Sequence, residues 1–509
     1  MKEKTKLLAM YLPQFHYVRE NEEWWGEKFT DWTAVKNSVP RFPGHNQPEI
    51  PLNGNYYDLL DKKTIQWQAN LAKNYLIDGF CIYHYWFQNG RQILEKPAEN
   101  LLKWKDIDIQ YSFSWPTESW TRTWVGIGNS WADVFENRKN DKNDQGYLLR
   151  QQYGNENDWK EHFMYLLPFF KDERYIRIDG KPLFHFYSSA SMPCYERMVL
   201  YWRELASEYG LKGLYIVGQD MPSPVSDATV QIMYPGITKM INDNMCGGLS
   251  VYSYSKTWER FLQMLPYSNN DTIWMCMVNY DDTPRRGGNG KILSGFKPYL
   301  FKQYLKQLIK KNNTNKSSLI FLNAWNEWGE GMHLEPDDTY GYKVLESVKQ
   351  ARNEIEPIEN FDVNLKKHND VLHLEYQNIE KEMYRFKMYY NMMKSWTMLK
   401  QQKRNVCTYL LQHGYRRIAV YGLGVHGHIF YQEFQAAGVS CAFAVDRLNQ
   451  EKMKQEKIPV FGIEETWPDC DLMVITVVDK YYEIFNKIKE KLSCPIVSLY
   501  EVVVEAGSE

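Results

Sequence analysis

The chain has 509 residues, which is too long for one ordinary domain and predicts about two to four. Hydrophobic residues make up 44% and charged residues 24%, as in a globular protein with a core, and the formal net charge of −2 leaves no basic footprint for a nucleic acid partner. The eight cysteines are scattered without a CxxC pair, which predicts a reduced, intracellular chain and no metal site.

The first apolar run, Leu7–Leu12, is followed at once by Pro13 and Gln14. It is too short for the apolar core of a signal peptide and therefore predicts a first strand. No apolar stretch of the sequence approaches the roughly 20 residues that a membrane-spanning helix needs. We therefore expect a cytoplasmic protein without a transmembrane segment.

Apolar, β-rich runs recur from residue 7 to about residue 330, and amphipathic stretches such as Lys63–Asn74 and Tyr195–Ser207 separate them. Most runs are continuously apolar, as expected of strands that are buried on both faces. Their alternation with helices predicts an α/β fold, a (β/α)8 TIM-like barrel with insertions, and an open doubly wound sheet is the alternative. The eight runs are Leu7–Leu12, Gly79–Tyr85, Ile109–Trp115, Pro182–Tyr187, Leu214–Val217, Val230–Tyr234, Ile273–Val278 and Leu319–Leu322.

Polar and aromatic residues follow nearly every one of these runs. In a (β/α)8 barrel the carboxyl ends of the strands lie on one face, where the following loops build the active site. We therefore predict that these residues gather in one site, where aromatic rings stack on sugar rings and polar groups bind hydroxyls. The set predicted to bind substrate comprises Gln14, His16, Tyr83, His84, Tyr85, Tyr234 and Asn279.

The segment after the third predicted strand, Ser114–Trp124, combines three tryptophans with Glu118. We interpret it as a subsite wall in which Trp115 and Trp120 stack on sugar while Glu118 or Arg122 bonds to hydroxyl groups. The alternative is an apolar plug that contains an internal Glu118–Arg122 ion pair at four-residue spacing.

The segment after the eighth predicted strand places Glu327 and Glu330 three residues apart, interleaved with Trp325, Trp328 and glycines. Paired carboxyl groups move protons when glycosidic bonds are cleaved. We therefore predict that the two glutamates are catalytic and that the two tryptophans bind substrate. The alternative is a pair of surface carboxylates that flank a glycine turn.

Two other features give weaker signals. His45, like His16 and His84, is interpreted either as a ligand of a sugar hydroxyl or as a structural or exposed residue. The charged residues of the segment 281–286 (Asp281, Asp282, Arg285 and Arg286) are interpreted as a solvated loop that its own ion pairs hold.

Residues 356–404 predict a helical linker, because they carry no strand signal and are rich in Lys, Glu, Gln and Asn. Apolar residues recur there at alternating spacings of four and three, which is the a/d pattern of a coiled coil. We expect a long helix that either lies on its own chain or pairs residues 370–395 in a homodimer. The repeat consists of Leu372, Tyr376, Ile379, Met383, Phe386, Tyr390 and Met393.

Residues 405–509 predict a second, small α/β domain of the Rossmann-like type. A glycine-rich loop follows the predicted strand Ile418–Tyr421 and opens a helix, and an aspartate ends the next strand. This is the fingerprint of dinucleotide binding in its proper context. The domain either binds a nucleotide, a nucleotide sugar or NAD, or keeps the turn without a ligand. The predicted cofactor-binding residues are Gly422, Gly424, Gly427 and Asp446.

Many segments closely resemble the WbsX-type proteins, glycosyltransferases of bacterial surface-polysaccharide clusters whose domain is similar to glycoside hydrolase family 99. The resemblance covers about residues 5–355, with its motifs in the family's order. Relatives have WANE where this chain has WPTE at 115–118, so the loop before Glu118 departs from the pattern. The segments are YLPQFH (11–16), NEEWWGEKFTDWT (21–33), FPGHNQP (42–48), DGFCIYHYWF (78–87), SWPTESWTRTW (114–124), DDTPRR (281–286), NAWNEWGEG (323–331) and LEPD (334–337).

The resemblance implies a (β/α)8 catalytic domain over residues 1–355 that acts on glycosidic bonds without a cofactor. Family 99 enzymes are retaining endo-α-mannosidases and endo-α-mannanases. By position, the resemblance implies that Glu327 deprotonates the 2-hydroxyl of the substrate sugar, which then attacks the anomeric carbon. It likewise implies that Glu330 protonates the leaving oxygen and then activates the acceptor, a substrate-assisted scheme.

We therefore expect a carbohydrate-active enzyme that transfers or hydrolyses a glycosyl unit of an oligosaccharide or polysaccharide during bacterial surface-polysaccharide or lipopolysaccharide (O-antigen) biosynthesis. Transfer and hydrolysis use the same carboxylates, because water and a sugar hydroxyl are interchangeable acceptors. The alternative is a non-catalytic glycan-binding or scaffold protein of polysaccharide assembly.

Overall fold

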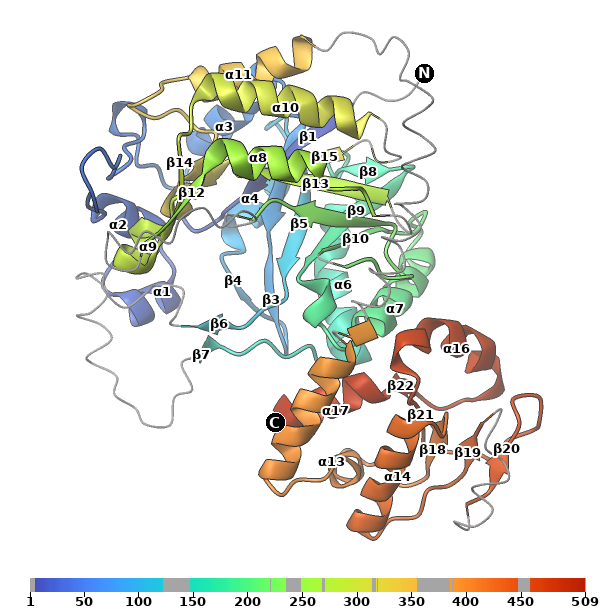
Figure 1. Ribbon diagram of the computed structural model, residues 1–509. Coiled ribbons are helices and arrows are strands. Elements are labelled where there is room, and N and C mark those ends of the chain that lie inside the picture. The colour runs from blue at the N-terminus through green and yellow to red at the C-terminus, as the bar shows by residue number, and fades with distance from the viewer. Residues whose placement is uncertain are drawn as a thin grey trace, which may run out of the picture. The chain divides into compact units, whose positions relative to one another are not determined.

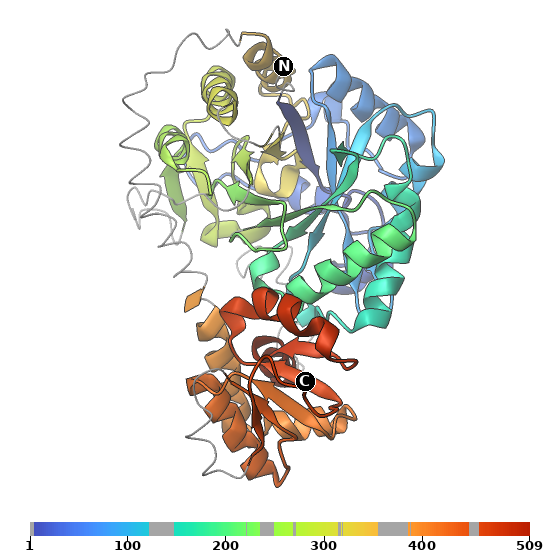
Figure 2. The same ribbon diagram turned by 90° about the vertical axis from the view of Figure 1, so that its right-hand side faces the viewer.

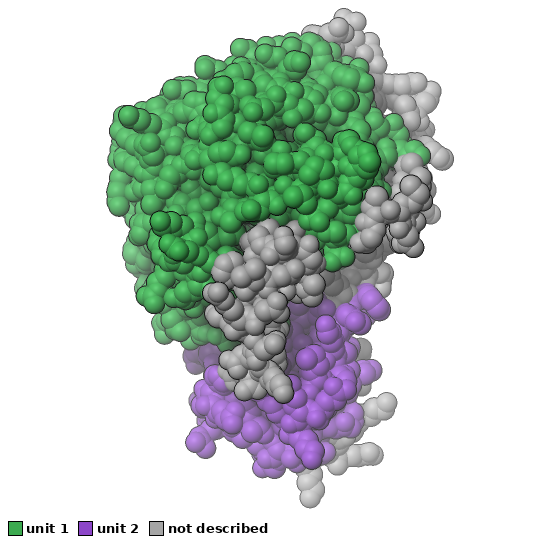
Figure 3. Space-filling view, turned by 90° about the vertical axis from the view of Figure 1, so that its left-hand side faces the viewer, with its two compact units in different colours: residues 1–191, 201–363 green, residues 192–200, 364–509 purple. Residues whose placement is uncertain are grey.

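The computed structural model describes residues 5–121, 147–219, 221–234, 249–267, 271–313, 317, 319–354, 385–386, 388–446 and 458–508. The chain forms two compact units, which Figure 3 colours separately: residues 1–191 with 201–363, and residues 192–200 with 364–509. Arg122 and the part of the heptad repeat before residue 385 lie outside the described residues.

The first unit contains a closed barrel of parallel strands, with helices outside them (Figures 1 and 2). In the described part of the chain, eight strands run in the order β10-β11-β13-β15-β1-β2-β5-β9, and β9 pairs with β10 to close the ring. The predicted (β/α)8 barrel is therefore confirmed, and an open sheet is excluded. The strands are β1 (Lys6–Tyr11), β2 (Gly79–Tyr83), β5 (Gln110–Pro116), β9 (Lys181–Tyr187), β10 (Tyr215–Gln219), β11 (Ala228–Ile232), β13 (Asp271–Met277) and β15 (Leu319–Asn323).

The barrel strands are buried along almost their whole length, because one face of each points into the barrel and the other packs against helices. This double burial explains why the runs in the sequence are continuously apolar rather than alternating. Within the described ranges no helix has the length and apolar character that crossing a bilayer requires. The main barrel helices are α3 (Lys62–Asn74), α4 (Lys96–Lys103), α6 (Glu156–Phe170), α8 (Tyr254–Gln263), α10 (Pro298–Asn312) and α11 (Lys343–Asn353). Helix α7 (Tyr195–Glu208) begins within residues 192–200, which are grouped with the second unit, and its residues from 201 onward belong to the first unit.

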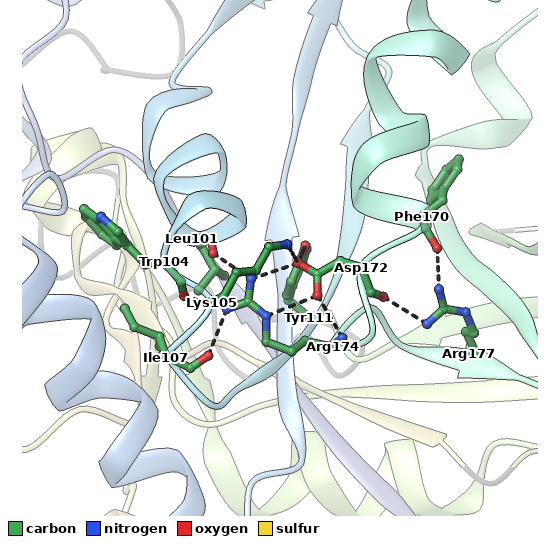
Figure 4. Close-up of polar contacts among 9 residues, drawn as sticks. All are labelled: Leu101, Trp104, Lys105, Ile107, Tyr111, Phe170, Asp172, Arg174 and Arg177. Carbon is green, nitrogen blue, oxygen red and sulfur yellow. Dashed lines mark hydrogen bonds and ion pairs between the residues drawn. The ribbon is translucent and has the colours of Figure 1, made fainter.

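Hydrogen bonds and ion pairs connect the loops at the amino ends of β5 and β9 (Figure 4). The Asp172 carboxylate accepts hydrogen bonds from Lys105 at 2.7 Å and from Arg174 at 2.8 and 3.2 Å. Burial opposes ionisation of Asp172, but these bonds hold its pKa below the usual value. The Arg174 guanidinium also donates, at 2.7–2.9 Å, to the backbone carbonyls of Leu101, Trp104 and Ile107. At this end of a (β/α)8 barrel such a network serves stability.

Short elements at the other end of the barrel build its mouth. The predicted strand Gly79–Tyr85 is in fact two strands, because pairing with β5 ends at Tyr83 and the chain then turns into the hairpin of β3 and β4. An apolar cluster packs α1 against two of the hairpins through Trp24, Trp25, Tyr85 and Trp120. These elements are α1 (Arg19–Trp25), α2 (Asp31–Lys36), β3 (Tyr85–Phe87), β4 (Arg91–Ile93), β6 (Trp120–Thr121), β7 (Tyr147–Leu149), α9 (Thr283–Arg286), β16 (Asn326–Glu327) and β17 (Met332–His333).

The second unit contains a parallel sheet, so the predicted small α/β domain is confirmed. Among its described residues, five strands run in the order β20-β19-β18-β21-β22. The strands are β18 (Ile418–Tyr421), β19 (Ala444–Val445), β20 (Val460–Phe461), β21 (Leu472–Ile475) and β22 (Ile496–Ser498), and the helices include α13 (Val406–Gln412), α14 (Val425–Ala437), α16 (Tyr481–Ile488) and α17 (Leu499–Ser508).

The second half of the predicted linker belongs to this unit. Residues 388–401 are helical, and Met392, Trp396 and Leu399 are buried in the core of the sheet domain. The Trp396 indole donates to the buried Glu433 carboxylate of α14 at 2.8 Å. The boundary predicted between residues 404 and 405 therefore lies inside the unit, because the linker helix supplies part of its core.

Candidate active site

A cavity of about 310 Å³ opens at the carboxyl ends of the barrel strands. Five strands reach it with their last residue or the residue after it: Leu12, Tyr83, Pro116, Tyr187 and Asn323. Among the predicted site residues, the structure brings seven together in its lining: Gln14, Tyr83, Tyr85, Glu118, Trp120, Glu327 and Glu330. The pocket therefore lies where the sequence predicts it, at the carboxyl ends of the barrel strands.

Arg285, from α9, lies at the centre of the carboxylates. Its Nη2 donates to Glu327 Oε1 at 2.6 Å and to Asp31 at 3.1 and 3.2 Å, and its Nη1 donates to Glu330 Oε1 at 2.8 Å. Glu327 and Asp31 are buried, whereas the Glu330 side chain is 30% exposed. Burial alone favours a neutral guanidinium, but the three carboxylates hold the pKa of Arg285 above its usual value, so it is a permanent cation.

The interpretation of the segment 281–286 as a solvated loop is wrong, because Asp281 and Asp282 are buried, but one internal ion pair does form, between Arg286 and Asp282 at 3.1 Å. Arg285 holds the catalytic candidates, and the buried Asp281 carboxylate accepts hydrogen bonds from His45 and Gln47, each at 2.7 Å. His45 is thus a structural partner of Asp281. The missed signal was positional: the segment follows the seventh predicted strand, at the same end of the barrel as the other site residues.

Two glycines let the turn that carries the glutamates pass close to its neighbours. A Cβ on Gly329 would lie 2.6 Å from Arg285 Nε and 2.7 Å from Asp31 Oδ2. Gly331 has φ +62°, and a Cβ there would lie 2.9 Å from the backbone nitrogen of Asp281. That nitrogen donates to the carbonyl of Glu330 at 2.7 Å. The glycines are therefore needed to seat the glutamate pair against Arg285.

The two glutamates differ in their surroundings. Burial raises the pKa of Glu327; the charge of Arg285 opposes this rise, and those of Glu330 and Asp31 reinforce it. Glu330 is partly open to the pocket. The pair therefore places one buried and one partly exposed carboxyl group on the same guanidinium.

Trp325 and Trp328 do not face the pocket, so the prediction that they bind substrate is wrong. Both are fully buried, and their indole nitrogens donate to the carboxylate of Glu335 at 2.9 and 2.8 Å. Trp328 also stacks on His333, with ring centroids 3.7 Å apart. The indoles instead anchor the turn that bears Glu327. Sequence reasoning missed Glu335, although it lies in the matched LEPD segment.

Five other predicted substrate ligands also lie outside the lining. Trp115 is buried and donates to the carbonyl of Trp86 at 3.0 Å. His84 is buried with its Nε2 2.8 Å from that of His162, and burial lowers its pKa to about 3, so it is neutral. The remaining three are His16, which is buried, Asn279, which is partly buried, and Tyr234, which is exposed.

Aromatic rings and one further carboxylate form the walls of the pocket. Trp120 and Tyr85 meet edge to face, with ring centroids 5.0 Å apart. Glu118 accepts a hydrogen bond from the Ser188 hydroxyl at 2.6 Å. The sequence prediction missed Trp25, Phe29 and Tyr187, which also line the pocket. That these residues contact substrate stays a prediction.

In the second unit, the predicted cofactor-binding residues lie together, but packing already explains most of them. Gly422 has φ +94°, and a Cβ on Gly427 would lie 2.0 Å from the carbonyl oxygen of Gly422, whereas one on Gly424 would meet nothing within 4 Å. The Asp446 carboxylate accepts the backbone N–H of Leu423 at 2.5 Å. Ligand binding at this loop therefore stays a prediction.

A (β/α)8 barrel whose carboxyl-end pocket holds paired carboxyl groups between aromatic walls is typical of carbohydrate-active proteins. Residues 7–348 match the family model described as Glycosyltransferase WbsX. The chain belongs to the glycosyltransferase WbsX family. This match confirms the resemblance found in the sequence.

Curated relatives are the uncharacterized proteins WxcX of Xanthomonas campestris pv. campestris. The chain is 30% identical to WxcX of strain B100 over 362 residues, which cover 68% of this chain and 49% of WxcX. It is 29% identical, with the same coverage, to WxcX of a second strain. The chain thus spans about half the length of these relatives.

Solved structures give more distant likenesses. A GH99 endo-α-mannosidase from Bacteroides thetaiotaomicron has a TM-score of 0.41 and 14% identity, covering 69% of this chain and 97% of that one. A β-galactosidase from the psychrophilic Marinomonas ef1 has a TM-score of 0.36 and 8% identity, covering 97% and 75%. The barrel is defined by its own strand pairing, independently of these likenesses.

Proposed function

We propose that this protein is an enzyme that transfers or hydrolyses α-linked glycosyl units, with Glu327 and Glu330 as its proton-transferring pair. The observation that carries the proposal is that Arg285 holds both glutamates at 2.6 and 2.8 Å in the lining of an aromatic-walled pocket. Following the family resemblance, Glu327 is the base toward the sugar 2-hydroxyl and Glu330 is the acid/base.

The shared contact with Arg285 supports a coupled proton transfer by the two glutamates, and the division of their roles rests on the family resemblance. In the first step Glu330 protonates the leaving oxygen as its bond to the anomeric carbon breaks, while Glu327 takes the 2-hydroxyl proton as that oxygen bonds to the anomeric carbon. One carboxyl group loses a proton and the other gains one, so the total charge around Arg285 stays constant. Arg285 then only strengthens its bond to the newly ionised Glu330. In the second step the acceptor oxygen bonds to the anomeric carbon as the bond from that carbon to the 2-oxygen breaks. Glu327 returns its proton to the 2-oxygen, and Glu330 takes the proton of the acceptor.

The setting of the reaction is the assembly of a bacterial surface polysaccharide or lipopolysaccharide in the cytoplasm. This part of the proposal rests on the WbsX family and on the sequence resemblance. The chain spans about half the length of its curated relatives, so a role that belongs to the whole relative is only proposed for this chain.

The test is turnover of a panel of α-linked oligosaccharides, mannose-containing ones first, with and without sugar acceptors and nucleotide sugars. Products are followed by mass spectrometry in ¹⁸O-water, because hydrolysis places the label at the new reducing end and transfer does not. Retention of anomeric configuration is expected, and Glu330→Gln is the inactive control. If wild type and control bind the glycans equally and neither turns any over, the protein is a glycan-binding protein and the enzyme proposal fails.

The pH dependence follows from the buried base. Glu327 must be ionised to act, and burial raises its pKa. The value of kcat/KM should therefore rise with pH along a limb that lies above the range of an ordinary glutamate. Asp31→Asn removes a negative charge that raises this pKa, so the limb should move to lower pH, whereas the exposed Glu346→Gln should leave it in place. A limb in Asp31→Asn at the same pH as in wild type would contradict the assignment.

For the second unit, we infer that the loop at Gly422–Gly427 binds a nucleotide, a nucleotide sugar or NAD. This glycine-rich loop joins β18 to the start of α14, and Asp446 directly follows β19. A glycine loop and an acidic residue in these positions are the features of a dinucleotide site, and they support this inference. Titration calorimetry of the full chain with each compound is the test. Heat of binding that Gly424→Val abolishes is expected, because that position has room for a ligand but not for a branched side chain beside it. Absence of heat with all compounds favours an empty fold.

We also propose that the helix before the sheet domain pairs two copies of the chain. Phe386 and Tyr390 are 72% and 57% exposed and stack on each other, and Met393 is also exposed. All three are a/d positions of the heptad repeat. The double variant Phe386→Glu, Tyr390→Glu should be monomeric by light scattering at concentrations where wild type and the exposed Lys394→Ala variant are dimeric. A monomeric wild type would exclude the dimer.

A further inference from the structure

We propose that Cys470 and Cys494 form a reversible disulfide, which makes the second unit a site of thiol oxidation. The two sulfur atoms lie 3.3 Å apart in the reduced protein. Cys470 precedes β21 and Cys494 precedes β22, and these strands are direct neighbours in the sheet. This pair is independent of the barrel pocket and of its chemistry.

The strand pairing explains how two cysteines that are far apart in sequence meet. In the parallel ladder Met473 lies opposite Ile496, and the backbone nitrogen of Met473 donates to the carbonyl of Pro495 at 3.0 Å. The residues just before the two strands are therefore held side by side. The sequence pattern without a CxxC pair gives no sign of this contact, because it is made across the sheet.

The surroundings give the two thiols different roles. Cys494 is partly exposed, whereas Cys470 is buried. The hydrogen bond with Cys470 lowers the pKa of Cys494, and the same contact raises the pKa of Cys470. Cys494 is therefore the nucleophile that meets an oxidant, since the thiolate is the reactive form, and Cys470 is the resolving thiol.

With a hydroperoxide as oxidant the reaction is balanced. The Cys494 thiolate attacks one peroxide oxygen, the O–O bond breaks, and Cys494 becomes a sulfenic acid. The leaving hydroxide takes up the proton that the thiol had released and departs as water. The Cys470 sulfur then attacks Cys494 Sγ, the S–O bond breaks, and a second water leaves with the Cys470 proton. Two thiols and one hydrogen peroxide thus give one disulfide and two waters.

The disulfide would close residues 470–494 into a loop that includes β21 and α16. Cross-linking restricts the unfolded chain, so the oxidised second unit should unfold at a higher temperature than the reduced one. Cys441 offers a matched comparison: its Sγ lies 3.3 Å from the carbonyl oxygen of Phe443, and that contact is to backbone.

The experiment treats the folded full chain with hydrogen peroxide, blocks the remaining thiols with a maleimide and maps tryptic peptides by mass spectrometry. Lysines at 480, 487, 489 and 491 separate the two cysteines, so the disulfide joins two peptides. We expect that cross-linked pair, its loss with dithiothreitol, a raised unfolding temperature, and the same result in Cys441→Ser. In Cys470→Ser, Cys494 should instead react with dimedone as a sulfenic acid.

Two results would overturn the proposal. One is complete maleimide labelling of both cysteines after peroxide treatment of the folded protein. The other is a cross-link that forms equally well in guanidinium, where the sheet no longer holds the thiols together. Circular dichroism of the variants separates loss of the cross-link from loss of the fold.

Discussion

Glu330→Gln should lower kcat/KM for an unactivated glycoside by about 10²–10⁴-fold, because it removes the group that protonates the leaving oxygen. The amide has nearly the same volume, and its oxygen can still accept the Arg285 hydrogen bond now made at 2.8 Å. The unfolding temperature should therefore change little. Glu327→Gln should cost at least as much, because the 2-hydroxyl then has no base. Steady-state kinetics on the substrate found in the panel measures both losses.

Leaving-group dependence separates the two roles. An aryl glycoside with an acidic phenol needs no protonation, so Glu330→Gln should recover most of its first-step rate with that substrate. Glu327→Gln should not recover, because the 2-hydroxyl must lose its proton whatever the leaving group is. The exposed Glu346→Gln on α11 is the matched control. Recovery in Glu327→Gln instead of Glu330→Gln would mean that the assigned roles are exchanged, and equal recovery in both would refute the division.

The position of the pocket could be predicted from the sequence, because it depends on a periodic signal and a general rule. Continuous apolar runs indicate doubly buried parallel strands, and the carboxyl ends of such strands share one face in a closed barrel. Side-chain direction was the step that failed. Tyr83 and Tyr85 line the pocket, whereas His84 points into the core, as the two-residue period of an extended chain requires.

Arg285 could not be assigned in the same way. Its partner Asp31 lies 254 residues away in sequence, and only the closed barrel brings them together. A local reading paired the charges of the segment 281–286 with each other, because neighbours in sequence are the only partners that a sequence shows. The two tryptophans beside Glu327 were misassigned for a related reason. Indole rings suit a sugar site, but indole N–H groups also suit a buried carboxylate that needs hydrogen-bond donors. Glu335 accepts hydrogen bonds from both indoles.

Glu335→Ala should lower the free energy of unfolding of the barrel by about 3–5 kcal/mol, because each buried donor left without an acceptor costs about 1–3 kcal/mol and such costs do not add fully. The carboxylate accepts four hydrogen bonds at 2.7–2.9 Å, from the side chains of Tyr57, Gln68, Trp325 and Trp328. Removing it leaves those buried donors without an acceptor, which costs far more than the lost bonds contribute. Urea denaturation followed by tryptophan fluorescence measures the change.

Graded variants test this cause. Glu335→Gln keeps one acceptor oxygen and should cost about half as much, and Trp328→Phe, which removes one donor and leaves the carboxylate three, should cost only about 1–3 kcal/mol. A midpoint in Glu335→Ala equal to that of wild type would show that the donors find water instead. Because Trp325 and Trp328 flank Glu327 in the chain, loosening them should also lower kcat below the unfolding transition. Stability and catalysis should therefore fall together along this series, whereas in Glu330→Gln only catalysis should fall.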